Sequence, residues 1–471
     1  MSASPGMPAR ATAAHGAATR DERDFLGVQQ VPQDALYGIG THRALRNSGV
    51  GGLTLAEQPL LLDAMAEVKS AAALANVALG CLATPIAEAL VAAASEVTAR
   101  KLDEHFPLEI VQGGGGTALN TNVNEVLANR ATVILGGTLG DHLVDPHSHA
   151  NLSQSTNDVF PTAMCLAVYR AVQNSLAALD HLRDQLIVLA ETNEGLEHLG
   201  RSCLQDALPV PVSQVHLTHE RSLARARKDL YDAAAPLLSV PLGGTAVGTG
   251  LGAPSRYAEE AVSQLRELTG LSLTLAEQFG VGLASLEPFA AVADAMARAG
   301  RSLARVAGDI RLLSSGPVGG IGEVVLPALQ AGSSIMPGKV NPVLPELVIQ
   351  VHYQLAGAAT IVAMAAASVD LEVTPMGPVA SVEILQGLSR LEAVARMFAD
   401  RCLTGLRWHR PNVSANLEGS FADAVELSSS VGFEKAARTK YADVLEDEPE
   451  LPGAAQQANA TTAQPESRTG T

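Results

Sequence analysis

The sequence predicts an all-α protein organised around a bundle of long helices. Apolar residues make up 47% of the 471 residues and aromatic residues only 3%, so alanine, leucine and valine must fill the core. Such small side chains favour closely packed helices over an aromatic-rich β-sandwich. A second observation is an apolar seam that advances by four and three residues in alternation, the heptad pattern of packed helices. The seam consists of Val292, Met296, Ala299, Leu303, Val306, Ile310 and Leu313. No alternating strand pattern is convincing in the core.

Apolar-periodic segments locate the helices of this bundle. We expect long helices at about 158–192, 288–314, 345–369 and 378–404, after shorter ones at 55–80 and 85–103. At 1.5 Å per residue, a helix of about 27 residues is a rod about 40 Å long. Rods of that length with mostly small side chains cannot bury their apolar faces as one globule. The sequence therefore predicts a bundle that other subunits complete, in a homotetramer.

Composition divides the chain into segments. Residues 1–22 are rich in alanine, serine, glycine and proline and are expected to form a disordered arm. An N-terminal helical domain is expected over 23–155, the central long-helix bundle over 156–410, and a small C-terminal domain of short helices over 411–445. Residues 446–471 begin with an acidic run and continue as polar, proline-containing sequence, which predicts a disordered tail.

Composition also argues against several classes of function. The net charge of −17 disfavours nucleic-acid binding, which needs a basic face, but it does not disfavour a small anionic substrate. The four cysteines are scattered without a CxxC pair, which indicates reduced thiols in a cytoplasmic protein rather than disulfides or a zinc site. We expect no membrane partner, because no charge-free apolar run of about 18 residues in a spanning pattern and no signal peptide is evident.

The loop at 332–342 separates two of the predicted helices and has the sequence Gly-Ser-Ser-Ile-Met-Pro-Gly-Lys-Val-Asn-Pro. Hydroxyl, ammonium and amide groups on a loop between rigid helices suit anion chemistry. A phosphate-binding P-loop is rejected for two reasons. Five residues separate Gly332 from Gly338, where that motif has four between its glycines, and Val340 stands where the motif needs Ser or Thr. On spacing alone, an ordinary loop of glycine and proline remains the alternative.

Two further stretches either bind an anion or only shape the backbone. Glycines at 113–116 precede Thr117 and can bring the backbone close to a ligand, although a flexible turn is the alternative. Residues 153–162 open the first long helix. Their hydroxyl and amide groups either cap it or, with its free N–H groups and positive dipole end, hold an anion. We do not predict a metal site at His147 and His149, because the sequence places no carboxylate or third histidine with them.

The 332–342 loop closely resembles the signature of the aspartase/fumarase superfamily, lyases that eliminate a group from succinate derivatives to give fumarate. The resemblance spans about residues 24–440 and includes 112–129, 153–162, 200–207 and 243–250. It implies a three-domain helical fold and a homotetramer whose active sites are each built from three chains. It also implies that Ser333 is the catalytic base. The substrate-binding residues that it implies are Thr117, Ser155, Thr156, Asn157, Ser202, Cys203, Ser334, Lys339 and Asn341.

The chain departs from the family pattern at several of these motifs. Leu119 stands at a usually polar position, and Thr121 at one usually held by methionine. Ser202 keeps the hydroxyl of the usual threonine, whereas Cys203 replaces a residue that is His in fumarases and His or Gln in aspartases. Glu346 aligns with the acid that partners this histidine, so it is at most a supporting residue here. The resemblance implies no cofactor and no metal.

The reaction that the resemblance implies is a β-elimination. A base removes a proton next to one carboxylate, and preorganised donors stabilise the dianion that results. Loss of hydroxide needs a general acid, whereas an ammonium group leaves as neutral ammonia, so the missing histidine at Cys203 penalises a fumarate hydratase more than an ammonia-lyase. Thr156 is also what aspartases tend to show. We therefore expect elimination of ammonia from L-aspartate. The alternatives are a fumarate hydratase, a lyase for an N-substituted aspartate and, in a different class, an inactive helical scaffold.

Overall fold

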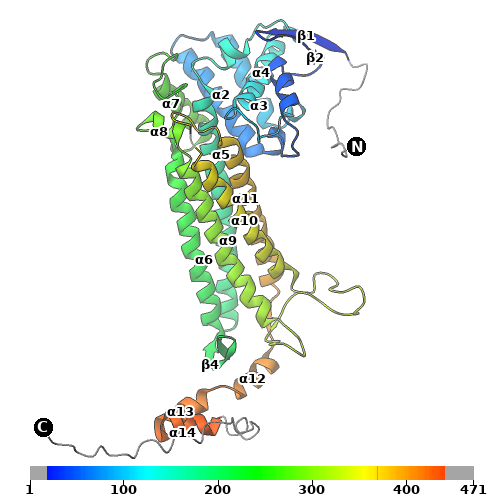
Figure 1. The fold of residues 1–471 in the computed structure, drawn as a ribbon, viewed down its shortest axis with the longest axis vertical. Helices are drawn as coiled ribbons and strands as arrows, with labels where there is room; N and C mark the ends of the chain where they lie inside the picture. Colours follow the sequence, from blue (N-terminus) through cyan, green and yellow to red (C-terminus); the bar gives the residue numbers. More distant parts are fainter. Residues whose placement is uncertain (1–17, 369, 441–471) are drawn as a thin grey trace, which may run out of the picture.

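The computed structural model describes residues 18–368 and 370–440 and shows an elongated, mainly helical molecule (Figure 1). A cluster of shorter helices and loops forms one end, and long helices form a shaft. Small helices near the C-terminus lie beyond the opposite end (Figure 1). This arrangement confirms the predicted helical fold with a central bundle of long helices.

The shaft is a closed ring of long helices. They are α5 (Thr156–Thr192), α6 (Val212–Ala234), α9 (Glu287–Leu313), α10 (Val343–Ala366) and α11 (Gly377–Phe398). Each packs against the next in this order, and α11 returns to α5. Glycines permit close approach inside the ring: a Cβ on Gly300 would lie 2.6 Å from Leu355, and one on Gly387 would lie 2.5 Å from Met296.

The heptad seam of α9 is covered within one chain, so the expectation that its burial needs other subunits is wrong. Its residues Val292, Met296, Ala299, Leu303, Val306 and Ile310 are all buried. The reason is that α6, α10 and α11 pack against α9, and α6 is not among the helices that the sequence predicts. Large apolar side chains stay exposed on α10, where Tyr353 is 65% and Met364 67% exposed.

Within the described part of the chain, α10 is the helix that is long and apolar enough to cross a membrane by length and composition alone. Residues 347–368 contain no Asp, Glu, Lys or Arg, which corrects the expectation that the sequence lacks a charge-free run of this length. Gln, His, Tyr and Thr are spread through the stretch and mask it when the sequence is searched for unbroken apolar residues.

The end of the molecule that precedes the shaft consists of short elements around α2, which packs against α3, α5 and α7. Its elements are β1 (Thr19–Asp24), β2 (Gly27–Pro32), α1 (Ile39–Ala44), α2 (Pro59–Ala78), α3 (Thr84–Thr98), α4 (Thr117–Ile134), β5 (Ser239–Val240), α7 (Tyr257–Thr269), β6 (Thr274–Leu275) and α8 (Phe279–Ala284). Helices α2 and α3 confirm the helices expected at 55–80 and 85–103, and each has a proline in its first turn, where the missing N–H needs no partner.

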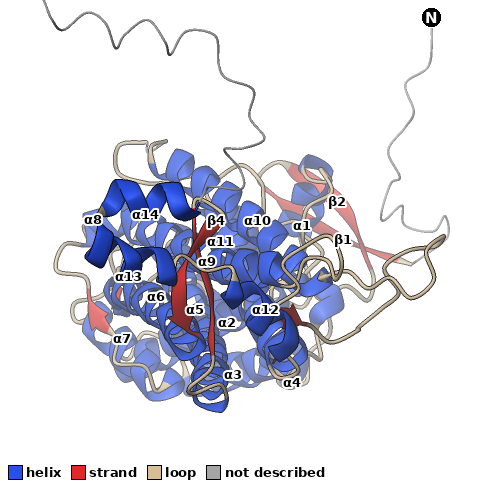
Figure 2. Cartoon of the chain, turned by 90° about the horizontal axis from the view of Figure 1, so that it is seen from below, coloured by secondary structure: helices blue, strands red, loops and turns tan. Residues whose placement is uncertain are grey.

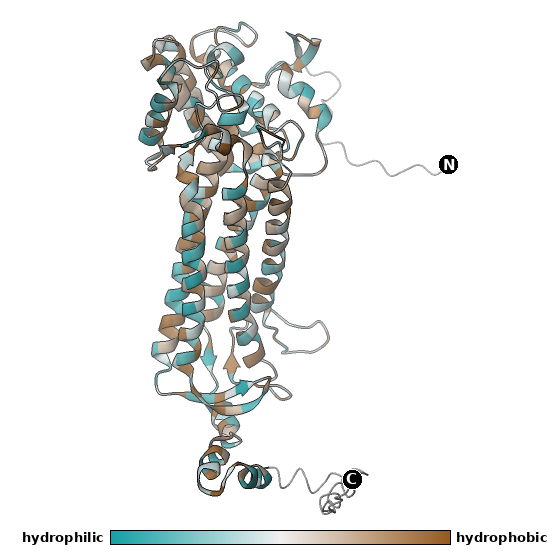
Figure 3. Cartoon of the chain, turned by 60° about the vertical axis from the view of Figure 1, so that its left-hand side comes forward, coloured by the Kyte–Doolittle hydropathy of each residue, from teal (hydrophilic) through white to brown (hydrophobic). Residues whose placement is uncertain are grey.

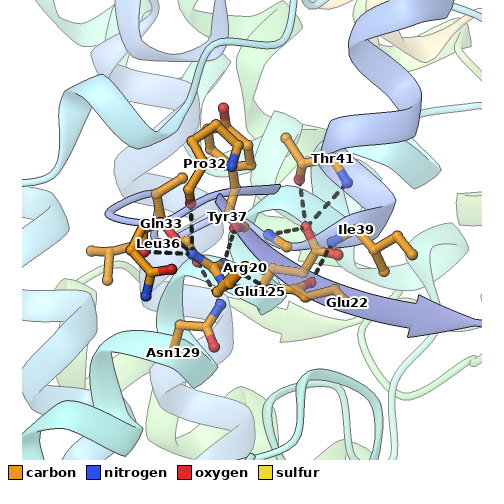
Figure 4. A network of polar contacts seen from close by, with 12 residues as sticks. Arg20, Glu22, Pro32, Gln33, Leu36, Tyr37, Ile39, Thr41, Glu125 and Asn129 are labelled. Carbon is orange, nitrogen blue, oxygen red and sulfur yellow. Dashed lines mark hydrogen bonds and ion pairs between the residues drawn. The ribbon is translucent and has the colours of Figure 1, made fainter. Parts of the chain in front are cut away.

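The expected disordered arm includes residues 19–22. In the structure these residues instead form part of the antiparallel β1–β2 hairpin, which begins at Thr19. Residues 1–17 lie outside the described part. The fold of the hairpin depends on Arg20, whose buried guanidinium pairs with Glu22 at 2.7 Å. It also donates to the main-chain carbonyls of Pro32, Ala35 and Tyr37 (Figure 4).

Next to this cluster, Glu125 of α4 holds the start of α1 (Figure 4). Its carboxylate accepts hydrogen bonds from the N–H groups of Gly38 at 2.8 Å and Gly40 at 2.7 Å, and from the Thr41 hydroxyl at 2.6 Å. Burial raises the pKa of Glu125, and these hydrogen bonds oppose the shift. The hairpin and α1 are thereby fixed to α4.

The opposite end of the shaft contains elements that the sequence did not reveal. They are the antiparallel hairpin of β3 (Glu197–Ser202) and β4 (Gln205–Pro211), and the short pair β7 (Val324–Val325) and β8 (Arg407–Trp408). Beyond them lie α12 (Arg410–Glu418), α13 (Ala422–Val431) and α14 (Phe433–Lys440), in front of the bundle in Figure 2. These helices occupy the segment expected to hold short helices, as far as residue 440. The predicted tail at 446–471 lies outside the described residues.

Candidate active site

A cavity of about 510 Å³ lies where the shaft meets the N-terminal elements. Its wall combines the start of α4, the residues that lead into α5, and a turn that precedes α7. The polar residues that line it are Thr117, Asn120, Thr121, Asn124, His147, Asn151, Ser153, Gln154, Ser155, Thr156, Asn157 and Thr245. The fold thus brings together the predicted site residues Thr117, Ser155, Thr156 and Asn157.

A capping box shapes the start of α5. Ser155 Oγ accepts a hydrogen bond from the Asn157 N–H at 3.2 Å, and Asp158 Oδ1 accepts one from the Ser155 N–H at 2.9 Å. The second oxygen of Asp158 accepts from the N–H groups of Gly243 and Thr245, both at 3.0 Å. Burial raises the pKa of Asp158, and these hydrogen bonds oppose the shift. The cap therefore fixes the helix start and joins the 243–245 turn to it.

Thr117 reaches the cavity because glycines precede it. Gly114, Gly115 and Gly116 have φ values of 90°, 63° and 91°, which side chains rarely adopt. A Cβ on Gly116 would also lie 2.9 Å from the ring of Phe160 on α5. The glycine run thus lets α4 begin directly against α5.

The departures from the family pattern on α4 have different locations. Leu119 is fully buried and belongs to the hydrophobic core, so its apolar character does not alter the cavity wall. Thr121 lines the cavity and adds a hydroxyl where the family usually has methionine.

A buried charge that the sequence pattern did not reveal lies behind the cavity. Lys69 of α2 is 3% exposed, and its Nζ donates to Asn151 Oδ1 and to Gln154 Oε1, both at 2.9 Å. Burial lowers the pKa of Lys69 to about 7, and the charge of Asp158 opposes this shift. The available signal was a lysine within the largely apolar stretch 59–78, since a lysine is rarely buried without partners.

Ser202 and Cys203 lie at the other end of the shaft, where Ser202 ends β3 and Cys203 begins the turn to β4, and both are exposed. Cys203 has a φ of 54° and lines a separate cavity of about 480 Å³. Beside this hairpin, Glu323 pairs with Arg201 at 2.8 Å and with His198 at 3.1 Å. Burial would raise the pKa of Glu323, but hydrogen bonds from these two residues and a third partner lower it to about 2.

The 332–342 loop joins α9 to α10 at this same end (Figure 1). Ser333 Oγ accepts hydrogen bonds from the N–H groups of Ile335 at 3.2 Å and Met336 at 3.0 Å. The loop is closed at its base by the Gly332 N–H, which donates to the Lys339 carbonyl at 2.7 Å. These contacts direct two main-chain donors at the oxygen of the predicted base.

The other predicted residues of this loop have few contacts. Ser334 and Lys339 are exposed, and Lys339 has no ion-pair partner among the residues that the structure describes. Asn341 is partly buried and donates to the Gly332 carbonyl at 3.0 Å. Glu346, in the first turn of α10, pairs with Arg311 at 3.5 Å rather than with a histidine.

The predicted site residues therefore form two groups at opposite ends of the shaft. Thr156 begins α5, and this helix continues for 37 residues toward the β3–β4 hairpin. At 1.5 Å per residue, such a helix is roughly 55 Å long. A single copy of the chain cannot bring Thr156 and Ser333 to one substrate.

Comparisons with known proteins identify the family of this chain. A family model described as "Lyase" matches residues 27–357. Aspartate ammonia-lyase of Bacillus subtilis (strain 168) is 36% identical over 420 residues, which is 89% of this chain and 88% of that protein. Fumarate hydratase class II of Brucella suis biovar 1 is 39% identical over 425 residues, covering 90% and 91%.

Solved structures show the same fold. Fumarate lyase:delta crystallin from Brucella melitensis bound to cobalt superimposes with a TM-score of 0.87 at 38% identity, covering 91% of this chain and 93% of that one. Recombinant class II fumarase from Schistosoma mansoni gives a TM-score of 0.87 at 32% identity with the same coverage. The chain therefore belongs to the aspartase/fumarase superfamily of lyases.

Proposed function

We propose that this protein is an aspartate ammonia-lyase that converts L-aspartate reversibly to fumarate and ammonia. The observation that supports the choice of an amine is a pair of unpaired acceptors on two asparagines that line the cavity. Asn120 and Asn124 each donate through Nδ2 to Asn151 Oδ1 at 3.1 Å. Their own Oδ1 atoms are buried without a hydrogen-bond partner in the described part of the chain. An ammonium group, with three N–H donors, suits such acceptors better than a hydroxyl with one.

In this proposal Ser333 removes the proton next to one carboxylate. The electron pair of the C–H bond moves into that carboxylate. It then returns to form the C=C bond of fumarate as the C–N bond breaks, and the electron pair of the C–N bond leaves on neutral ammonia. The N–H groups of Ile335 and Met336 directed at Ser333 Oγ favour its deprotonated form. Closure of the loop over the substrate would exclude water and strengthen these interactions.

The remaining predicted residues bind the substrate. Lys339, Asn341 and Ser334 hold the carboxylate that receives the charge, because cationic and amide donors stabilise the dianion. Thr117, Ser155, Thr156 and Asn157 supply hydroxyl and amide donors from the cavity, next to the positive end of α5. Ser202 and Cys203 complete the site from the β3–β4 turn, with Glu346 as a supporting residue.

We propose that the protein acts as a homotetramer in which different copies supply the separated groups. The distance between Thr156 and the far end of α5 requires more than one chain for a complete site. The exposed apolar face of α10 offers the contact, and it includes Leu347, Tyr353, Ile361 and Met364. Figure 3 shows hydrophobic and hydrophilic residues interspersed along the helices of the shaft. Burial of such a face between copies is favourable.

Two measurements test this assembly. Sedimentation of the purified protein at micromolar concentration should give a tetramer, and a stable monomer would exclude it. Mixed tetramers of Thr156→Ala and Ser333→Ala should regain part of the activity, because some sites then receive both groups intact. Mixed tetramers that stay inactive would show that sites are not shared between copies.

The proposed activity is tested by following the ultraviolet absorbance of fumarate with L-aspartate and then L-malate. Turnover of aspartate alone supports the ammonia-lyase. Turnover of malate alone supports a fumarate hydratase, a candidate that the similar identity to fumarate hydratases favours. Activity only with N-substituted aspartates would identify a lyase for such substrates. Binding without any turnover would identify an inactive helical scaffold. We also propose a cytoplasmic location, in keeping with four free cysteines.

A further inference from the structure

The cavity wall contains a chain of hydrogen bonds whose direction is set at Lys69. The two oxygens that receive its Nζ belong to Asn151 and Gln154. The Gln154 amide nitrogen donates to the carbonyls of Ala150 and Leu152, both at 3.1 Å. The Asn151 amide nitrogen donates to the Gln154 carbonyl at 3.2 Å. Each amide oxygen must therefore face Lys69. A lysine head has enough N–H donors for both oxygens whether it is charged or neutral, so protonation does not reverse the direction.

The next link is Asn151 Oδ1, which can only accept. Because it also receives the amide groups of Asn120 and Asn124 at 3.1 Å each, both side chains must turn Nδ2 toward it. These asparagines are only 3% and 2% exposed. The amide orientation that leaves their Oδ1 atoms unpaired is thus imposed by the chain itself.

The last link reaches a predicted substrate-binding residue. Asn120 Nδ2 also donates to Thr156 Oγ1 at 3.1 Å. This is the contact made by the Thr156 hydroxyl within the described residues, and the hydroxyl accepts in it. The hydrogen of that hydroxyl is therefore free to be given to another acceptor. Thr156 lines the cavity, so a carboxylate bound there can receive it.

We propose that Asn120 is a positioning residue, held by Lys69 and Asn151, that makes the Thr156 hydroxyl a committed donor to the ligand carboxylate. Without this contact the hydroxyl could accept or donate, and its orientation would have to be fixed at binding, at an entropic cost. The proposal rests on the proposed function only in requiring a dicarboxylate ligand, and it holds for aspartate and malate alike.

The chain provides a matched control for Asn120. Asn124 lies one turn further along α4, lines the same cavity and donates to the same Asn151 oxygen at the same distance, but it makes no hydrogen bond with Thr156. Both substitutions, Asn120→Leu and Asn124→Leu, remove one donor from Asn151. They differ in the link to Thr156.

The affinity for succinate, a dicarboxylate without a leaving group, is measured by calorimetry on the full assembled protein. Asn120→Leu should weaken binding about threefold, the cost of selecting one of about three staggered hydroxyl orientations, and Asn124→Leu less than about 1.5-fold. In a Thr156→Val background, Asn120→Leu should cause no further loss, because coupled residues are non-additive. Thermal unfolding checks that each variant is folded, and Asn120→Ala with Asn124→Ala replaces any leucine variant that is not.

Equal losses of succinate affinity for the two asparagine variants would overturn the positioning role of Asn120, and so would additive losses for Asn120→Leu and Thr156→Val. In either case, succinate binding by the native protein would leave the proposed function intact. Failure of the native protein to bind any dicarboxylate would instead remove the proposed function, and with it the ligand to which Thr156 is proposed to donate.

Discussion

The two ends of the shaft hold their candidate site residues in different ways. At the N-terminal end, Thr156 is fixed by a capping box and by a buried network that begins at Lys69. At the far end, Ser333 and Lys339 lie on a loop held mainly by its own backbone, with Lys339 exposed. The fold thus holds the first group with buried contacts, whereas the second group is exposed, and any contact that it makes to substrate or to another copy must form on binding. Such ordering costs conformational entropy at each binding event.

The largest effect is expected from Ser333→Ala. Because Ser333 is proposed to act only in proton transfer, its loss should abolish turnover and leave the fold and dicarboxylate affinity nearly unchanged. Kinetics with aspartate and calorimetry with fumarate measure the two quantities separately. Near-native turnover would mean that the base lies elsewhere and that the far end is not the catalytic half.

Lys339→Ala should have a smaller and mixed effect. The ammonium faces a carboxylate that is charged in both the ground state and the transition state, so KM should rise and kcat should fall, each by about tenfold or more. Steady-state kinetics with aspartate over a range of concentrations separates these parameters. If neither parameter changes, the exposed loop has only a structural role, and the far end of the shaft does not contribute Lys339 to the active site.

Glu323→Gln should affect stability and not the cavity at the other end. Loss of charge-assisted hydrogen bonds to Arg201 and His198 should destabilise the protein by about 1–3 kcal/mol at neutral pH. The pKa of Glu323 is lowered to about 2, so its contribution is complete above the unfolded-state pKa of about 4.3 and is lost as the pH falls toward 2. Urea unfolding should therefore show a difference from native protein that shrinks between about pH 5 and pH 2. Asp158 cannot produce this loss, because its raised pKa favours the folded state on acidification.

The smallest effect is expected from the ends of the chain. Removal of residues 1–17 and 450–471, stretches of mostly small and polar residues, should change activity by less than about twofold. Arg20→Ala is the contrasting variant, because it removes the buried guanidinium that joins the β1–β2 hairpin to the residues before α1. It should lower the unfolding temperature, whereas a large loss of activity from the truncation alone would contradict the prediction.

The sequence predicts the long helices to within a few residues, because apolar periodicity and first-turn prolines mark them. It does not reveal α6, since His216, His219 and Glu220 are buried on its inner face and interrupt the apolar pattern. His216 is retained there by the Trp408 indole N–H, which donates to it at 3.0 Å.

Motifs identify candidate site residues but not where they meet. Their spacing in sequence says nothing about which end of a shaft each occupies, and this follows only from the direction of every helix. The contacts of Lys69, Asn120 and Asn151 were equally hidden, because they join three separate elements.

The 37-residue length of α5 also fixes the distance between the two ends of the shaft. In a site shared between copies, this helix and its neighbours set how far apart the two halves stand, and a second copy must match that spacing. Deletion of seven residues would preserve the heptad register of a helix but shift one half of the site by roughly 10 Å, far beyond hydrogen-bond reach. Changes in chain length compatible with activity are thus confined to the ends and connecting loops, and the shaft can vary in sequence but not in extent.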